Sequence, residues 1–387
     1  MNIKALFEPS VQKFILQNID ADIRELAFKA QGKFDLPLGF LLDQINGRQK
    51  AKKKLPTWYK NNQIVYPIDL SMQQCSSETS AELKTKDIPN GKVCIDLGGG
   101  FGIDTYYLAK KFSQVIYVEQ NKELCDIVAH NCAVFGIKNV RTINLSAEEY
   151  INGLQKKVDL IFLDPARRDE NQNRIVQFED CSPNIVKIKD ELKEKASHLL
   201  IKASPIIDIR LAHQQLPEFK GTQVIGINNE CKEVLFHTYT HLPEIRCAHN
   251  SLGKLQEYTF ENKRETIPSF SEIDKYIYEP NVTIRKAQKQ DELGEQFDLK
   301  KLFKNGSLFT SSELKEGFPG RVFKIEKELT SKKEILKLKN AEVIAKNFPL
   351  TATDFKKKHK LGSSSSKFIL AFTDYLGKKN LLLCSKV

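Results

Sequence analysis

Residues Val93–Thr105 read VCIDLGGGFGIDT, an apolar run that leads through a carboxylate and four glycines to a helix-compatible run. Asp96 ends the apolar run, and Gly98, Gly99, Gly100 and Gly102 follow it. Glycine lets the backbone approach a ligand closely, and the N–H groups at the start of a helix bind polar or anionic groups. The order strand, tight turn, helix therefore predicts a ligand-binding loop at the end of a parallel strand.

The spacing of these glycines separates two classes of cofactor. The dinucleotide fingerprint G-x-G-x-x-G requires glycine or alanine three residues after Gly100, and this chain has Ile103 there. The observed D-x-G-x-G-x-G spacing resembles the S-adenosylmethionine (SAM) loop of class I methyltransferases. Such a loop implies backbone N–H groups near the methionine part of SAM, with Asp96 holding its amino group directly or through water.

A second carboxylate, Glu119, ends the next apolar run and lies 17 positions beyond Gly102. A carboxylate there can accept hydrogen bonds from both ribose hydroxyls. We therefore predict SAM as the cofactor, bound by the glycine loop and Glu119. Ser146 follows the third apolar run and is predicted to lie near the adenine. The same stretch equally fits an ordinary helix start, with Glu148 stabilising the helix dipole.

The third candidate group is Asp164-Pro165-Ala166-Arg167-Arg168, which follows the apolar run Val158–Leu163. Enzymes that methylate exocyclic amines in nucleic acids often carry Asn/Asp-Pro-Pro-Tyr/Phe at this point. There the oxygen accepts an N–H of the base and the aromatic ring stacks on it. In this chain Arg167 replaces the aromatic residue, and a guanidinium can stack on a base or bind phosphate. We predict Asp164, Pro165 and Arg167 as the catalytic group.

Two observations limit this prediction. Arg167 and Arg168 could instead form surface ion pairs with Asp169 or Glu170. Methylation of carbon 5 in a pyrimidine normally needs a cysteine nucleophile after the fifth strand, and residues 202–205 read KASP. The missing thiol argues against that route, and the target atom stays open.

The spacing of apolar runs predicts a doubly wound α/β fold. Helical patterns fill residues 1 to about 70, and strands then alternate with helices up to Tyr239. The last two strands are close enough for a hairpin, which gives the mixed, Rossmann-like seven-stranded sheet expected of class I methyltransferases. We expect a helical N-terminal region (1–75), a methyltransferase domain (76–242), a small α+β module (243–320) and a basic module (321–387) with the order β-α-β-α-β-β.

Composition describes an ordinary globular protein with a localised positive charge. The net charge of the 387 residues is +11, and residues 321–387 contain 16 Lys or Arg against six Asp or Glu. This basic segment favours a polyanion such as nucleic acid, although a solvated lysine-rich surface is the alternative. The eight scattered cysteines have no metal-site spacing, and no apolar stretch approaches 18 residues. We expect a cytoplasmic protein without a metal or a membrane partner.

Several segments together resemble a bacterial group of class I SAM-dependent methyltransferases with a C-terminal THUMP-like domain. They are residues 74–79 (QCSSET), the glycine loop, DPARR, KASP, Asn229-Glu230-Cys231, FPGRVF (318–323) and KNFP (346–349). The resemblance implies a ferredoxin-like module within 243–320 and places residues 74–79 over the methionine end of SAM. Because THUMP domains bind RNA in tRNA-modifying enzymes, it also implies an RNA methyltransferase.

We therefore predict methylation of a base in tRNA or rRNA, with the basic C-terminal module binding the RNA. One alternative is a methyltransferase for a protein or small molecule. Another is an inactive RNA-binding protein that keeps a SAM fold, which the intact loop and Glu119 disfavour. A nicotinamide-dependent enzyme is disfavoured by Ile103.

Overall fold

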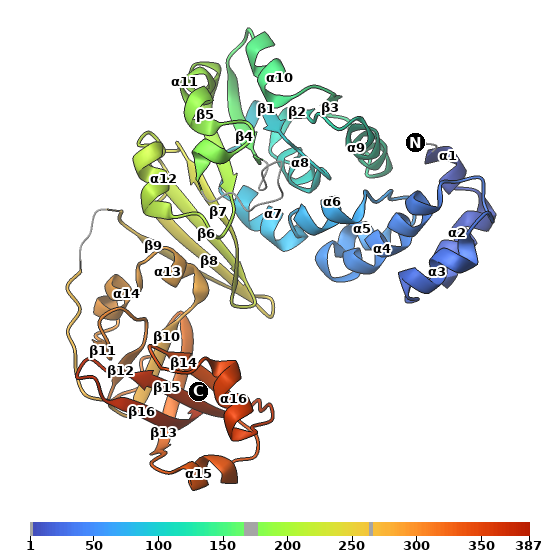
Figure 1. The fold of residues 1–387 in the computed structure, drawn as a ribbon. Helices are drawn as coiled ribbons and strands as arrows, with labels where there is room; N and C mark the ends of the chain where they lie inside the picture. The colour runs from blue at the N-terminus through green and yellow to red at the C-terminus, as the bar shows by residue number, and fades with distance from the viewer. Residues whose placement is uncertain (1–2, 166–176, 263–265) are drawn as a thin grey trace. The chain divides into compact units, whose positions relative to one another are not determined.

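The computed structural model describes residues 3–165, 177–262 and 266–387. The chain forms two compact units, Met1–Ile225 with Lys232–Glu244, and Gly226–Cys231 with Ile245–Val387. Figure 1 follows both along the chain. Each unit has its own buried core. The two are described separately below.

Short helices fill the first part of the first unit, as predicted. Asp22 caps α3, and Ser77 caps α7 through the N–H of Ser80. The basic run at 48–54 belongs to the long helix that begins at Leu38. The helices are α1 (Ile3–Leu6), α2 (Pro9–Gln17), α3 (Ile23–Ala30), α4 (Leu38–Lys54), α5 (Pro56–Lys60), α6 (Asp69–Gln74) and α7 (Glu78–Thr85).

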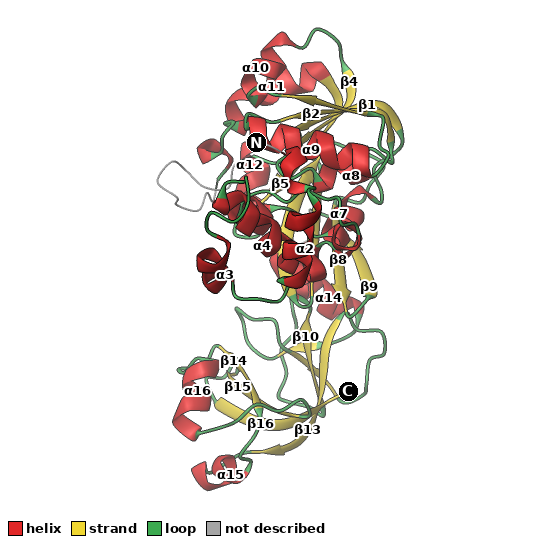
Figure 2. Ribbon diagram, turned by 90° about the vertical axis from the view of Figure 1, so that its right-hand side faces the viewer, coloured by secondary structure: helices red, strands yellow, loops and turns green. Residues whose placement is uncertain are grey.

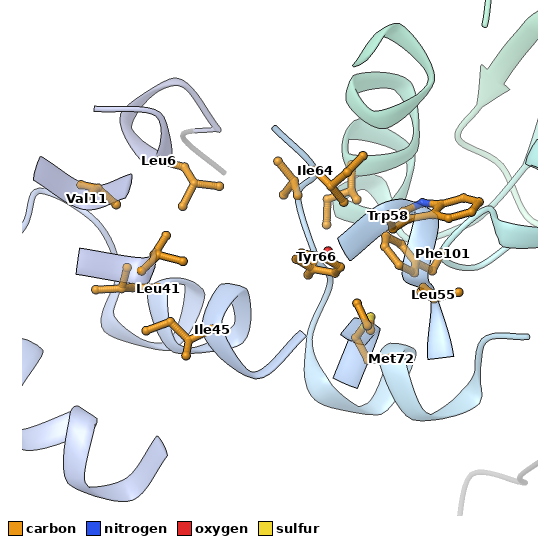
Figure 3. Packing of buried hydrophobic residues seen from close by; sticks show 14 of the residues in the cluster. Leu6, Val11, Leu41, Ile45, Leu55, Trp58, Ile64, Tyr66, Met72 and Phe101 are labelled. Atoms are coloured by element: carbon orange, nitrogen blue, oxygen red, sulfur yellow. The ribbon is translucent and has the colours of Figure 1, made fainter. Parts of the chain in front are cut away.

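This helical region packs on the glycine loop. Phe101, from the loop, is buried beside Tyr66, with ring centroids 6.1 Å apart. Trp58 stands edge-on to Tyr106 of the following helix at 4.6 Å. Figure 3 shows Leu55, Trp58, Tyr66 and Phe101 gathered in one apolar cluster. Burying side chains of this size contributes about 1.5–3 kcal/mol each. The helical region is therefore fixed on the loop that it adjoins.

Strands β1 to β7 lie side by side in the order β3-β2-β1-β4-β5-β7-β6, which is part of a nine-stranded sheet. Strands β1 to β5 pair in parallel, and β7 pairs antiparallel with β5. This confirms the predicted mixed sheet. The elements are β1 (Gly91–Leu97), α8 (Ile103–Leu108), β2 (Phe112–Val118), α9 (Lys122–Val134), β3 (Val140–Ile143), α10 (Ala147–Gly153), β4 (Val158–Leu163), a 3-10 turn (Phe178–Asp180), α11 (Ile185–Lys195), β5 (Ala196–Ala203), α12 (Ile209–Gln215), β6 (Gly221–Ile227) and β7 (Glu230–His237).

The second unit combines a hairpin with a seven-stranded sheet in the order β11-β12-β10-β13-β16-β15-β14. The predicted order of the last segment, β-α-β-α-β-β, is observed as β13 to β16 with α15 and α16 (Figure 2). Ser331 and Glu334 form a capping box at the start of α15. The elements are β8 (Ile245–Ser251), β9 (Lys254–Phe260), β10 (Tyr276–Pro280), α13 (Val282–Lys286), α14 (Gln290–Gln296), β11 (Lys300–Lys301), β12 (Phe309–Ser311), β13 (Gly320–Glu328), α15 (Lys332–Lys337), β14 (Glu342–Lys346), α16 (Ala352–His359), β15 (Lys367–Thr373) and β16 (Lys379–Lys386).

None of the helices that the structure describes is long and apolar enough to cross a bilayer. Within the same residues, no group of three or more His, Cys, Asp or Glu side chains could hold a metal ion.

Candidate functional site

Strand register brings the predicted site residues together at one edge of the first unit's sheet. Leu97 of β1 pairs with Val118 of β2 and with Leu163 of β4. Leu163 in turn pairs with Ile201 of β5. The residues that follow these paired positions are Gly98 after β1, Glu119 after β2, Asp164 after β4 and Lys202 in β5. The strand order reverses between β1 and β4, which is where open α/β sheets bind their ligands.

Glycine is required in the loop by backbone conformation and by space. Gly98 has φ +76°, and a Cβ there would lie 3.0 Å from the carbonyl oxygen of Asp164. Gly99 has no room either, because a Cβ would meet the Tyr117 ring at 2.3 Å. Gly100 and Gly102 also have positive φ, +53° and +75°. At Gly100 a Cβ would project into open space, and Gly100 lines the cavity described next.

A cavity of about 440 Å³ opens over this loop, entirely within the first unit. Its volume falls in the range of roughly 300–1,000 Å³ that small-molecule sites occupy. The glycine backbone forms one wall, and the carboxylates of Glu119 and Asp164 are among the polar groups that line it. The other lining residues include Gln74, Cys75, Ser76, Asp104, Leu145, Ala147, Glu148, Pro165 and Lys202.

The Glu119 carboxylate is half-buried and held by backbone N–H groups. Gly100 N–H donates to Oε2 at 3.2 Å, and Asn121 N–H donates to Oε1 at 2.9 Å. A carboxylate oxygen can accept two hydrogen bonds, so each keeps room for a further donor. Glu119 is thus oriented by the loop and can still accept a pair of hydroxyl groups. The glycine cradle, the cavity and this carboxylate fit the predicted SAM.

Asp96 does not reach the cavity. Its side chain is fully buried, and Oδ2 accepts a hydrogen bond of 2.5 Å from the Thr105 hydroxyl. Burial raises the pKa of Asp96 to about 7. Asp96 therefore links the end of β1 to α8 by a buried hydrogen bond. The carboxylate of this stretch that lines the cavity is that of Asp104.

Ser146 is likewise not among the residues that line the cavity. Its hydroxyl accepts from Glu149 N–H at 3.2 Å, while Glu149 Oε2 accepts from Ser146 N–H at 2.9 Å. This capping box turns Ser146 to the start of α10. Its neighbours Leu145 and Ala147 face the cavity instead.

Asp164 and Pro165 lie at the end of β4 and line the cavity. The Asp164 N–H donates to Leu97 C=O at 3.2 Å, which fixes the backbone beside the glycine loop. The Asp164 side chain is 22% exposed, and its Oδ2 lies 2.5 Å from Lys202 Nζ. Arg167, the third member of the predicted catalytic group, lies outside the described residues.

Lys202, which the sequence prediction missed, bridges two carboxylates at the base of the cavity. Its side chain is only 1% exposed, and its Nζ also lies 3.2 Å from Asp104 Oδ2. A buried ammonium needs such partners, because losing its water is costly. One signal was present in the sequence: a single lysine at the carboxyl end of the apolar strand HLLIKA, next in register to Asp164.

A second buried lysine, Lys84 of α7, extends this network. Its Nζ lies 2.7 Å from both Asp104 Oδ1 and Glu233 Oε2, and it donates to Ser76 Oγ at 2.7 Å. Burial alone would raise the pKa of Asp104 and Glu233, but the charges of Lys84 and Lys202 outweigh it and hold both below their usual range. The network anchors Ser76, from the predicted cofactor segment 74–79, at the cavity wall.

Comparison with known proteins agrees with this geometry. Residues 91–167 match the family model described as RNA cap guanine-N2 methyltransferase. Residues 276–319 match a ferredoxin-like domain, and residues 320–386 match a THUMP domain-like family.

Individual proteins are similar over different shares of the chain. The ribosomal RNA small subunit methyltransferase J of Francisella philomiragia subsp. philomiragia is 24% identical over 188 residues, which are 44% of this chain and 77% of that protein. An RNA methyltransferase of Caldanaerobacter subterraneus subsp. tengcongensis, named as uncharacterized, is 30% identical over 129 residues, 30% of this chain and 28% of that protein.

A crystal structure covers almost the whole chain. It is that of a proposed methyltransferase from Porphyromonas gingivalis W83, with 28% identity, a TM-score of 0.82 and coverage of 98% of both chains. The comparisons support SAM as the cofactor and confirm that this chain is an enzyme, a methyltransferase whose catalytic domain precedes a ferredoxin-like and a THUMP-like domain.

Proposed function

We propose that the chain transfers a methyl group from SAM to a base in tRNA or rRNA. The observation that carries this proposal is the single cavity that contains the glycine loop, Glu119, Asp164 and Pro165. It offers a cofactor cradle and an acceptor-binding carboxylate side by side. The relatives named as RNA methyltransferases and the THUMP-like domain support RNA as the class of substrate.

Different residues of the chain would hold different parts of the cofactor. Bound SAM would supply an electrophilic methyl group on a sulfonium centre. Glu119 would accept the ribose hydroxyls, and the Gly98–Gly102 backbone with Ser76 would adjoin the methionine part. Asp96 would support the loop from beneath, and Leu145 and Ala147, in place of Ser146, would contact the adenine.

Asp164 would act on the methyl acceptor. Its carboxylate lines the cavity and is held by Lys202 at 2.5 Å, so it can accept an N–H of a base without turning away. Holding the nucleophilic nitrogen in line with the methyl group is a positioning effect, and it can supply much of the rate. Pro165, which also lines the cavity, would confine the base.

Glu119→Gln should lower the affinity for SAM by about 10- to 100-fold, because the charge-assisted hydrogen bonds to the ribose lose the carboxylate. Isothermal titration calorimetry with SAM measures this. The matched control is Glu123→Gln, an exposed glutamate on α9 that is not among the cavity-lining residues. An affinity equal to that of the control would remove Glu119 from the ribose site.

The class of acceptor is tested by supplying labelled SAM and the purified chain to the RNA, protein and small-molecule fractions of cells that lack the protein. We expect label in RNA, with smaller incorporation when the salt concentration rises, because phosphate contacts weaken with ionic strength. Label confined to protein or to small molecules would contradict the proposal and favour that other acceptor.

A further inference from the structure

Three sequence segments far apart in the chain meet at one buried carboxylate of the second unit. Glu279 is the next-to-last residue of β10, in the stretch EPN. Arg321 follows FPG at the start of β13, and Lys346 begins KNFP at the end of β14. The Glu279 side chain is 2% exposed. Arg321 lies directly opposite it in the β10–β13 ladder. The methyltransferase site uses none of these residues.

Three cations surround this carboxylate. Arg321 donates from Nε to Glu279 Oε2 at 2.8 Å and also pairs with it through its terminal nitrogen. On the other oxygen, Lys346 Nζ lies 3.3 Å and Arg285 Nη1, from α13, lies 3.5 Å from Oε1. Their combined attraction outweighs the effect of burial and holds the pKa of Glu279 below its usual range.

The cluster carries more positive charge than Glu279 neutralises. One carboxylate faces three cations, and within the described residues none of the three has another carboxylate partner. The side chains of Arg321, Lys346 and Arg285 are 32%, 31% and 24% exposed, so they can reach an external anion. Like charges held around one carboxylate repel one another, and a second anion relieves that repulsion.

We propose that Arg285, Arg321 and Lys346 form a phosphate-binding site for the RNA backbone, with Glu279 as the buried group that orients them. Forked guanidinium donors and an ammonium match phosphate oxygens. The site joins the ferredoxin-like match, which holds Glu279 and Arg285, to the THUMP-like match, which holds Arg321 and Lys346. This inference rests on the proposed RNA substrate and adds the place where the backbone is bound.

The test compares two neutralising variants of the full chain, with unfractionated tRNA as the probe, and the unaltered chain is also measured with rRNA. Lys346→Gln leaves the Arg321–Glu279 pair intact. The control, Lys324→Gln, removes the same charge from an exposed position of β13 whose side chain alternates to the other face from Arg321. Fluorescence anisotropy is measured from 50 to 200 mM KCl, and thermal unfolding confirms that both variants fold.

Lys346→Gln should weaken tRNA binding about tenfold and reduce the slope of log K against log [KCl] by about 1. The control should change both quantities less. If Lys346→Gln does not fold, Arg285→Gln is measured in its place with the same expectation. Binding and slope equal to those of the control would overturn the phosphate site alone. Absence of salt-dependent tRNA or rRNA binding by the unaltered chain would contradict both this site and the proposed RNA substrate.

Discussion

Asp164→Ala should lower kcat for RNA methylation by about 10²-fold or more, because the base loses the group that holds its nitrogen in line with the methyl group. The affinity for SAM should stay nearly unchanged, because Glu119 and the glycine loop hold the cofactor. Initial rates with labelled SAM, combined with calorimetry of SAM binding, separate the two quantities. The control is Asp180→Ala, an exposed aspartate of the same unit. Activity retained by Asp164→Ala would exclude Asp164 from the reaction.

Asp164→Asn distinguishes two roles for the carboxylate. If its oxygen only orients an N–H of the base, the amide oxygen of asparagine serves as well, and transfer should stay within about tenfold of normal. We expect this result, because Lys202 already occupies Oδ2 at 2.5 Å. A loss as large as that of Asp164→Ala would instead assign proton removal to the carboxylate.

Lys84→Met should lower the free energy of unfolding by about 3–5 kcal/mol, because it leaves Asp104 and Glu233 buried with one lysine fewer. The side chains of Lys84, Asp104 and Glu233 are 1%, 8% and 4% exposed, so water cannot replace the lost ion pairs of the two carboxylates. Urea unfolding followed by circular dichroism measures the loss. Lys92→Met, at an exposed position of β1, is the control. A difference below about 1 kcal/mol between the two variants would show that the network adds little to stability.

The same variant has a predictable pH dependence. The pKa values of Asp104 and Glu233 are lowered in the fold, so their ion pairs stabilise it above the unfolded pKa values near 4 and lose this effect as the pH falls through the folded values. The stability difference between the unaltered chain and Lys84→Met should therefore be largest near neutral pH and shrink in acid. A difference that is constant down to pH 3 would contradict this assignment.

The sequence predicted those parts of the site that local pattern determines. The glycine loop and Glu119 were identifiable because glycine, strand end and helix start follow one another in the chain. Asp164 was identifiable because it directly follows the apolar run that forms β4. Strand register then places all three at one sheet edge, as parallel pairing requires.

Two predicted cofactor residues, Ser146 and Asp96, bind partners within the protein and are not among the residues that line the cavity. Ser146 and Asp96 are polar residues at strand or helix ends, and the same residue types serve as ligands, caps and internal ties. In the structure, Ser146 caps α10 and Asp96 accepts a hydrogen bond from the Thr105 hydroxyl. Lys84 and Lys202 could not be paired from the sequence, because their common partner Asp104 lies 98 positions from Lys202 and meets both only in the fold.

In the second unit, the pairing of strands far apart in the sequence was likewise not predictable. Residues 243–320 and 321–387 were predicted as two modules, and separate family models match residues 276–319 and 320–386. The sequence did not predict that β10, β11 and β12 share one sheet with β13 to β16. The ladder between β10 and β13 joins them and places Glu279 opposite Arg321. Pairing between distant strands depends on tertiary packing, which local propensity does not report.

The central claim, a SAM-dependent RNA base methyltransferase that acts through Asp164, is tested most directly by nucleoside mass spectrometry of cellular RNA. Total tRNA and rRNA are compared among cells that contain the protein, cells that lack it, and the latter cells supplied with either the unaltered chain or Asp164→Ala. We expect one methylated nucleoside to disappear without the protein and to return only with the unaltered chain. Identical nucleoside profiles in all four samples, or restoration by Asp164→Ala, would contradict the claim.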